Sequence, residues 1–383
     1  MLTAHHSNDL DCLADLLAAH CRAEPLPALT PEIMVVPSIP TARWLSIAMA
    51  DRIGISANTH FVLPAAYTWA LIRRVLPDVP ERSPLSADAL FWRIAGLLQN
   101  IPADDAFDAV RFYLQGRDAK RRFELARELA DAFERYATYR PNWLARWMEG
   151  ADVQLGPHEA WQAKLFQLLV AAMPELPHVH PSERFFATLR RDRDARHRLP
   201  ARLFLFGITA LPPLYLEFFH RLGDFIPVTL FLPNPCREYW GQIARARTVG
   251  RVALESPDQT EYFDIGNRLF GSLAEHGRTF FNAIVEREQS ASEAFVEPDP
   301  TFLLGRLQRD ILDMVEPSDQ ADAFVLADAD RSITIDVCHG AMREADVLHD
   351  RLLGLFASDP SLRCEDILVL TPDLEQYGTA IEA

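Results

Sequence analysis

Short apolar runs and amphipathic helical stretches alternate at three places along the 383-residue chain. The first strand–helix–strand pattern covers residues 2–36, and the second covers residues 202–232. In the third, strands at 333–338 and 367–370 flank a helix from Met342 to Phe356. Repeated β-α-β units place parallel strands in one sheet and helices on its faces, so we predict an α/β fold with a parallel sheet.

Between about residue 76 and residue 200 the apolar positions recur at helical spacing, which predicts an all-helical domain inserted between strands of the sheet. We therefore divide the chain into residues 1–75 and 201–332, which form the sheet domain and a linker, a helical insertion at 76–200, and a further α/β region at 333–383. Residues 241–262 and 287–331 read as loops. A sheet with two strands is unstable alone, so we expect the chain to be a fragment or a truncated form of a longer protein.

The strand predicted at Ile33 to Val36 leads into a loop and then into a helix that Thr41 can cap. In α/β proteins this position, after the carboxyl end of a strand, usually holds the ligand. A nucleotide-hydrolysing motor would carry a glycine-rich loop with a lysine here. The loop contains Pro37 and Pro40, with no glycine and no lysine.

Other catalytic motifs are weak. Gly266 and Gly271 have phosphate-loop spacing, but Ser272 occupies the lysine position. Asp118-Ala-Lys120 and Gln162-Ala-Lys164 resemble the end of a metal-dependent nuclease motif, yet both fall in helical sequence without an acidic strand nearby. His178 and His180 have no further ligand at zinc spacing. A free-standing ATPase or Mg²⁺-dependent nuclease remains an alternative, as does a purely structural assembly subunit.

The charge distribution allows a polyanionic partner, although the net charge is −16. Residues 293–383 hold 20 acids and 6 arginines, whereas residues 111–146 hold nine bases against five acids. A local basic surface can bind phosphate even on an acidic chain. The five cysteines have neither metal-binding nor disulfide-framework spacing, which favours the cytoplasm. We find neither a membrane-spanning run nor a signal pattern.

Taken together, these segments resemble the RecC family, the gamma subunits of exodeoxyribonuclease V (RecBCD). The matching segments are His6-Ser-Asn8, Ile33 to Leu45, Gly54 to Asn58, Leu63-Pro-Ala65, Trp69, Ala130-Asp-Ala-Phe133, Tyr139 to Leu144, Ala160-Trp-Gln162, Phe206 to Pro213, Asn234 to Gly241, and Val337 to Leu353.

The resemblance implies a superfamily 1 helicase-like architecture that has lost its ATP-hydrolysis motifs. A first RecA-like domain would be interrupted by the helical domain, and a second RecA-like domain would begin near residue 333. It also implies a role in guiding single-stranded DNA and in recognising the Chi sequence during double-strand-break repair. The expected partners are RecB-like and RecD-like subunits and single-stranded and double-stranded DNA ends. This chain would be non-catalytic and without a cofactor, while ATP and Mg²⁺ would bind the partner subunits.

Six positions match those associated with DNA readout in the family: Ser38, Leu63, Trp69, Asp131, Glu134 and Arg140. Glu134 replaces an aspartate of the family pattern. Pro37, Ile39 and Ala132 depart from it, and none of the three side chains can hydrogen-bond a base edge. We therefore expect Chi specificity to be altered or lost, whereas stacking on Trp69 and the phosphate contact of Arg140 are retained.

Overall fold

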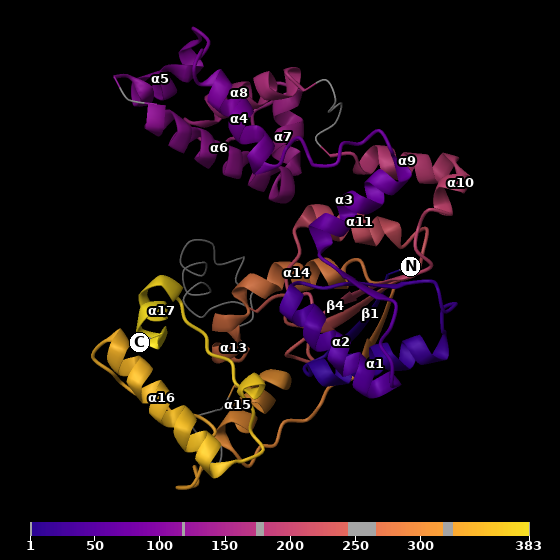
Figure 1. The fold of residues 1–383 in the computed structure, drawn as a ribbon, viewed down its shortest axis with the longest axis vertical. Helices are drawn as coiled ribbons and strands as arrows, with labels where there is room; N and C mark the ends of the chain where they lie inside the picture. Colours follow the sequence, from indigo (N-terminus) through magenta and orange to yellow (C-terminus); the bar gives the residue numbers. More distant parts are fainter. Residues whose placement is uncertain (1, 117–118, 174–179, 244–265, 317–324, 383) are drawn as a thin grey trace. The chain divides into compact units, whose positions relative to one another are not determined.

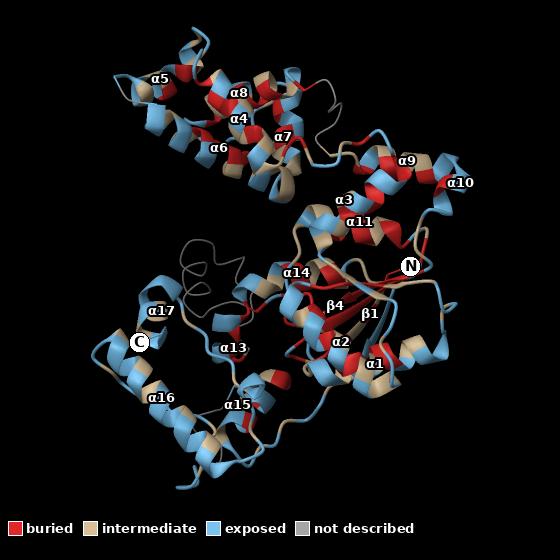
Figure 2. Cartoon of the chain, in the orientation of Figure 1, coloured by how far each residue is buried: buried red, intermediate tan, exposed pale blue. Residues whose placement is uncertain are grey.

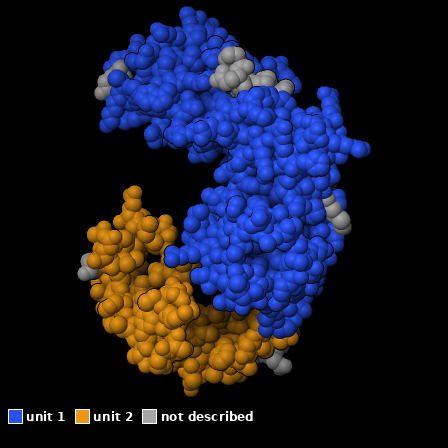
Figure 3. Space-filling view, turned by 45° about the vertical axis from the view of Figure 1, so that its right-hand side comes forward, with its two compact units in different colours: residues 1–297, 310–317 blue, residues 298–309, 318–383 orange. Residues whose placement is uncertain are grey.

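The computed structural model describes all residues except 1, 117–118, 174–179, 244–265, 317–324 and 383. The chain divides into two compact units (Figure 3). Unit 1 comprises Met1–Glu297 and Asp310–Pro317, and unit 2 comprises Pro298–Arg309 and Ser318–Ala383. The domain boundaries expected at residues 75/76, 200/201 and 332/333 stay predictions.

Unit 1 is built on a six-stranded sheet, counted over the described residues, with the order β3-β2-β4-β5-β1-β6. Figure 1 labels β4 and β1 in this sheet. Every pairing between neighbouring strands is parallel. The carboxyl ends of all strands therefore lie at one edge. The strands are β1 (Leu2–Ser7), β2 (Glu32–Val35), β3 (Thr59–Val62), β4 (Leu203–Phe206), β5 (Val228–Pro233) and β6 (Ser290–Glu293).

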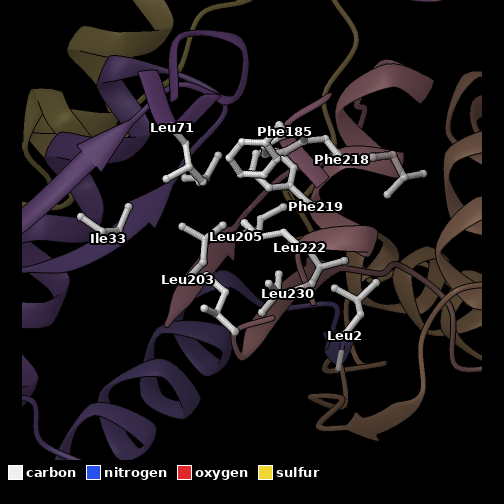
Figure 4. Close-up of a cluster of buried hydrophobic side chains, with 14 of the residues drawn as sticks. Leu2, Ile33, Leu71, Phe185, Leu203, Leu205, Phe218, Phe219, Leu222 and Leu230 are labelled. Carbon is white, nitrogen blue, oxygen red and sulfur yellow. The ribbon is translucent and has the colours of Figure 1, made fainter. Parts of the chain in front are cut away.

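The central strands are apolar on both sides because helices cover both faces of the sheet. In β4, Leu203 and Leu205 point into one core, and Phe204 and Phe206 into the other. Figure 4 shows part of the first core, where side chains of the covering helices gather around Leu203 and Leu205. The helices of this face are α3 (Pro64–Val75), α9 (Ser182–Arg191), α11 (Pro213–Leu222) and α14 (Glu275–Val285). The opposite face carries α1 (Leu10–Ala23) and α2 (Ile39–Ile53).

The first two strand–helix–strand predictions are confirmed, including α11 at its predicted bounds. The side chain of Asp9 caps α1 by accepting a hydrogen bond from the Cys12 amide at 2.7 Å. The prediction that Thr41 caps α2 is wrong. Ser38 is the N-cap, because Pro40, with its fixed φ, already lies inside the first helical turn.

A helical block with its own core lies between β3 and β4 in the sequence, as expected from the helical spacing. Leu90, Phe133, Trp147 and Phe166 are buried at its centre. Its helices are α4 (Ala87–Leu97), η1 (Asp105–Phe107), α5 (Asp108–Leu114), α6 (Ala119–Tyr139), α7 (Pro141–Met148) and α8 (Glu159–Ala171). The short helix α10 (Arg193–Arg196) follows α9.

The loops predicted at 241–262 lie almost entirely outside the described residues. The prediction of an irregular segment at 287–331 is wrong in part, since it contains β6 and α15 (Leu303–Leu312). Before it, α13 (Arg268–Leu273) begins at Asn267, whose side chain accepts from the Phe270 amide at 2.9 Å.

Unit 2 confirms the helix of the third predicted pattern but not its strands. The helix is α16 (Ala341–Ser358), and η3 (Cys364–Asp366) and α17 (Leu374–Glu382) follow it. Residues 333–338 and 367–370 form no strand, and Ile335 and Val337 are 86% and 94% exposed. Figure 2 shows α16 and α17 without buried residues. Among the described residues neither segment pairs with a strand, in keeping with the low stability of an isolated two-stranded sheet.

No helix in the described part of the chain is long and apolar enough to span a bilayer. All five cysteines are free thiols.

Candidate nucleic-acid interface

Two candidate residues lie at the carboxyl edge of the sheet, on neighbouring strands. Ser38 follows β2 and Leu63 follows β3, and Val35 of β2 is in register with Val62 of β3. Leu63 is the N-cap residue of α3 and its side chain is exposed. The structure therefore brings these two positions, 25 residues apart in sequence, to the same end of the sheet.

The hydroxyl groups of Ser38 and Thr41, in the loop after β2, form hydrogen bonds within that loop. Ser38 Oγ accepts from the Thr41 amide at 3.2 Å and lies 2.9 Å from Thr41 Oγ1. Pro37 and Pro40 have no N–H to offer a phosphate. Gly207, after β4, has a φ of +68°, and a Cβ built on it would lie 3.8 Å from Thr41 Cγ2. The loop is therefore packed against its neighbour and lacks the amide cradle that phosphate binding needs.

Trp69 lies on α3, half-buried against the first core. Its Nε1 donates to the carbonyl oxygens of Pro80 and Glu81, each at 3.1 Å. Its ring and that of His180 are in an edge-to-face arrangement with 6.0 Å between centroids, and burial lowers the pKa of His180 to about 4. Trp69 thus has its polar atom bound within the protein. The prediction that its face stacks on a base stays a prediction.

Asp131, Glu134 and Arg140 lie in the helical block, on α6 and directly after it. Asp131 is half-buried, and Glu134 and Arg140 are exposed. The carboxylate of Glu134 lies near Tyr215 of α11: burial raises the pKa of the Tyr215 hydroxyl, and the Glu134 charge acts in the same direction. This end of α6 is therefore placed beside α11.

Arg140 is the N-cap residue of α7 and lines a cavity of about 840 Å³. Its guanidinium lies 5.7 Å from the centre of the Trp143 ring, and one of its nitrogens donates to the Tyr139 carbonyl at 2.9 Å. The other five candidate residues lie outside the lining of this cavity. The candidate set is therefore distributed over the edge of the sheet, α3 and the helical block.

The cavity lining also includes two arginines that the sequence did not single out. Arg221 of α11 stacks over Phe186 of α9 at 4.2 Å and pairs with Glu183. Arg287 follows α14 and lies 3.5 Å from Glu217. The lining of this cavity thus contains three guanidinium groups, three carboxylates and four aromatic rings, those of Tyr139, Trp143, Phe186 and Phe218. Guanidinium groups bind phosphates and aromatic rings stack on bases, so the lining suits a single nucleic-acid strand.

The structure does not support the nuclease motifs. Lys120 lies 3.8 Å from Glu124 on the same helix, and Lys164 pairs with Asp104 at 2.5 Å. Asp118 falls outside the described residues. Within the described ranges, no group of three or more His, Cys, Asp or Glu side chains is arranged to hold a metal ion.

The fold defines the class of protein as an α/β protein whose parallel sheet is interrupted in sequence by a helical block. The family model described as "RecC, N-terminal domain" matches residues 2–314, and the chain belongs to this family. It is 35% identical to the RecBCD enzyme subunit RecC of Escherichia coli (strain K12), with 100% of the chain and 38% of that protein covered.

Two further relatives carry the same name. The RecC of Haemophilus influenzae is 30% identical, and that of Mycolicibacterium smegmatis is 33% identical, each over 100% of the chain. The chain covers 39% and 34% of their lengths. It thus spans between a third and two fifths of the relatives it matches.

Proposed function

We propose that this chain is a non-catalytic, DNA-guiding subunit of a RecBCD-type exonuclease V, acting in double-strand-break repair by homologous recombination. The observation that carries the proposal is a parallel sheet whose phosphate position holds Pro37 and Pro40, in a chain of the RecC family. A motor fold without a phosphate cradle retains a route for a nucleic-acid strand but has no place for the γ-phosphate.

The architecture that goes with this role is superfamily 1 helicase-like. Strands β1 to β3 precede the helical block and β4 to β6 follow it, yet all six join one sheet. This supports a RecA-like domain formed by residues 1–75 and 201–332 with a helical insertion at 76–200. Residues 333–383 would begin a second RecA-like domain.

In this function, Arg140 binds a phosphate together with the other arginines of the cavity. Trp69 stacks on a base, and Asp131 and Glu134 accept hydrogen bonds from base edges. Ser38 and Leu63 border the bound single-stranded DNA at the carboxyl edge of the sheet. Pro37, Ile39 and Ala132 offer no side-chain hydrogen bond, so Chi readout differs from the family pattern. RecB-like and RecD-like subunits would bind ATP and Mg²⁺ and carry out hydrolysis, in the cytoplasm.

Trp69 provides the test. We expect Trp69→Ala to weaken binding of a single-stranded oligonucleotide by about 1–3 kcal/mol, and Trp69→Phe to retain most of the affinity, because a phenyl ring still stacks. Fluorescence anisotropy measures the affinity, and thermal melts of both variants separate stacking from loss of packing. An unchanged affinity for a folded Trp69→Ala variant would assign the ring to the core and contradict its stacking role, and absence of oligonucleotide binding by the unmodified chain would contradict the proposed function.

A further inference from the structure

A cluster of three aromatic rings lies at the surface of the helical block, where Trp92 and Phe123 are exposed and Phe91 is half-buried against the core. Phe91 and Trp92 of α4 have ring centroids 4.9 Å apart, and Phe123 of α6 lies 5.8 Å from Phe91 and 6.3 Å from Trp92. Trp92 is 68% exposed and Phe123 is 43% exposed. Contiguous exposed rings of this kind usually mark a binding surface.

Cations flank the rings. The guanidinium carbon of Arg127 lies 5.8 Å from the centre of the Phe91 ring. Lys120, Arg121 and Arg122 occupy the start of α6, and the Lys120 side chain is 80% exposed. From Lys120 to Glu128 the sequence holds four cations and two acids, so the rings lie in a locally positive field.

One of the three rings, Phe123, shares a helix face with the candidate interface. Phe123, Arg127, Asp131 and Glu134 follow one another at intervals of four, four and three residues along α6. Side chains at these intervals lie along one face of a helix. The two ends of this face are about 16 Å apart, from the helical rise per residue.

We propose that Phe91, Trp92 and Phe123 form a second stacking site for unpaired bases of a single-stranded nucleic acid. Lys120 and Arg127 bind the phosphates on either side of the stacked base. Charge complementarity favours a nucleic acid over an apolar protein segment, because cations border the rings and an apolar segment offers them no anionic group. The inference rests on the proposed function, since it extends the strand from Asp131 and Glu134 along the same face of α6.

The experiment uses the full chain and fluorescently labelled oligo-dT, which stacks without sequence readout. Trp92→Ala and Phe123→Ala should each raise the Kd roughly 5- to 100-fold, the effect of losing one base–aromatic contact. Trp92→Leu should raise it to a similar extent, because leucine keeps an apolar contact with its neighbours but has no π-face. Phe302→Ala removes a ring of similar exposure (51%) from unit 2 and should leave the Kd unchanged.

A second measurement tests the phosphate contact. Arg127→Gln should reduce the slope of log K against log salt by about 0.7, the value for one phosphate contact on a single strand. Arg343→Gln, an exposed arginine on α16, should leave the slope as it is.

The outcomes separate this inference from the proposed function. If Trp69→Ala weakens binding while all three ring variants of this cluster bind like the unmodified chain, the second stacking site is wrong and the proposed function stands. If the ring variants weaken binding and Trp69→Ala does not, the second site is supported and the role of Trp69 is wrong. Absence of oligo-dT binding by the unmodified chain would overturn both.

Discussion

Glu159 is a buried carboxylate, 5% exposed, that ties the loop before α8 to α7. It accepts hydrogen bonds from Trp147 Nε1 at 2.9 Å and from the amides of Val153 and Leu155, each at 2.6 Å. Burial alone would raise the pKa of Glu159, but these donors outweigh it and lower the pKa to about 2. A carboxylate held by three donors is a strong local constraint on backbone structure.

We expect Glu159→Gln to lower the free energy of unfolding by about 1–3 kcal/mol, because the amide group turns an N–H toward a backbone N–H. Urea unfolding followed by circular dichroism measures the change. Glu149→Gln, at an exposed position of the same block, is the control and should change little.

The lowered pKa of Glu159 predicts that the free energy of unfolding depends on pH. A carboxyl group whose folded pKa is depressed stabilises the protein above its unfolded pKa, and this contribution is lost as the pH falls through the folded value. The stability difference between the unmodified chain and Glu159→Gln should therefore be full above pH 4.5 and shrink toward pH 2. A difference that stays constant over this window would contradict the charged, hydrogen-bonded state of Glu159.

Among the elements, α2 depends on a single cap. Ser38 Oγ satisfies the Thr41 amide at 3.2 Å, and Pro40 removes one of the remaining free amides. Ser38→Ala should lower the free energy of unfolding by about 1 kcal/mol. Ser46→Ala lies in the middle of the same helix, where alanine is the better helix former, and should be neutral or slightly stabilising. Equal losses for the two variants in thermal melts would show that the cap does not act as described.

The strands differ in how visible they are in the sequence. The strand β4 is four consecutive buried apolar residues, since helices cover both faces, and such a run is recognisable. The edge strand β6 has the sequence Ser-Ala-Ser-Glu with every side chain exposed, and β3 is only partly buried. Only backbone pairing with a neighbour defines them. Hydrophobic periodicity therefore finds the centre of the sheet and misses its edges.

The candidate interface also contains residues that could be named from the sequence and residues that could not. The family resemblance supplied Ser38 and Leu63, and the parallel topology explains why they meet, because Ser38 lies three residues after β2 and Leu63 directly follows β3. Arg221 and Arg287 reach the cavity from α11 and from the end of α14, and neither has a local sequence signal. Only the packing of segments far apart in sequence brings them to Arg140.

For the whole molecule, the net charge of −16 predicts repulsion of a nucleic-acid strand, whereas the arginines of the cavity predict that its phosphates are bound. If Arg140, Arg221 and Arg287 each contact one phosphate, these three contacts together should contribute about −2 to the slope of log K against log salt for a single strand. An oligonucleotide with uncharged linkages should bind weakly and with little salt dependence. A flat response for ordinary oligo-dT would show that the acidic surface dominates and would remove the phosphate contacts.

The last prediction concerns nucleotide. An ATP-binding sheet of this class holds phosphates on free amides and a lysine at the carboxyl edge. Here Pro37 and Pro40 have no amide hydrogen, the Thr41 amide is bonded to Ser38, and the loop contains no lysine. A ligand at 100 times its Kd stabilises a protein by about 2.7 kcal/mol, which a thermal melt detects readily. We expect millimolar ATP analogue with Mg²⁺ to leave the melting temperature of the chain unchanged. A rise that Ser38→Ala or Thr41→Val abolishes would place nucleotide at this loop and contradict the non-catalytic role.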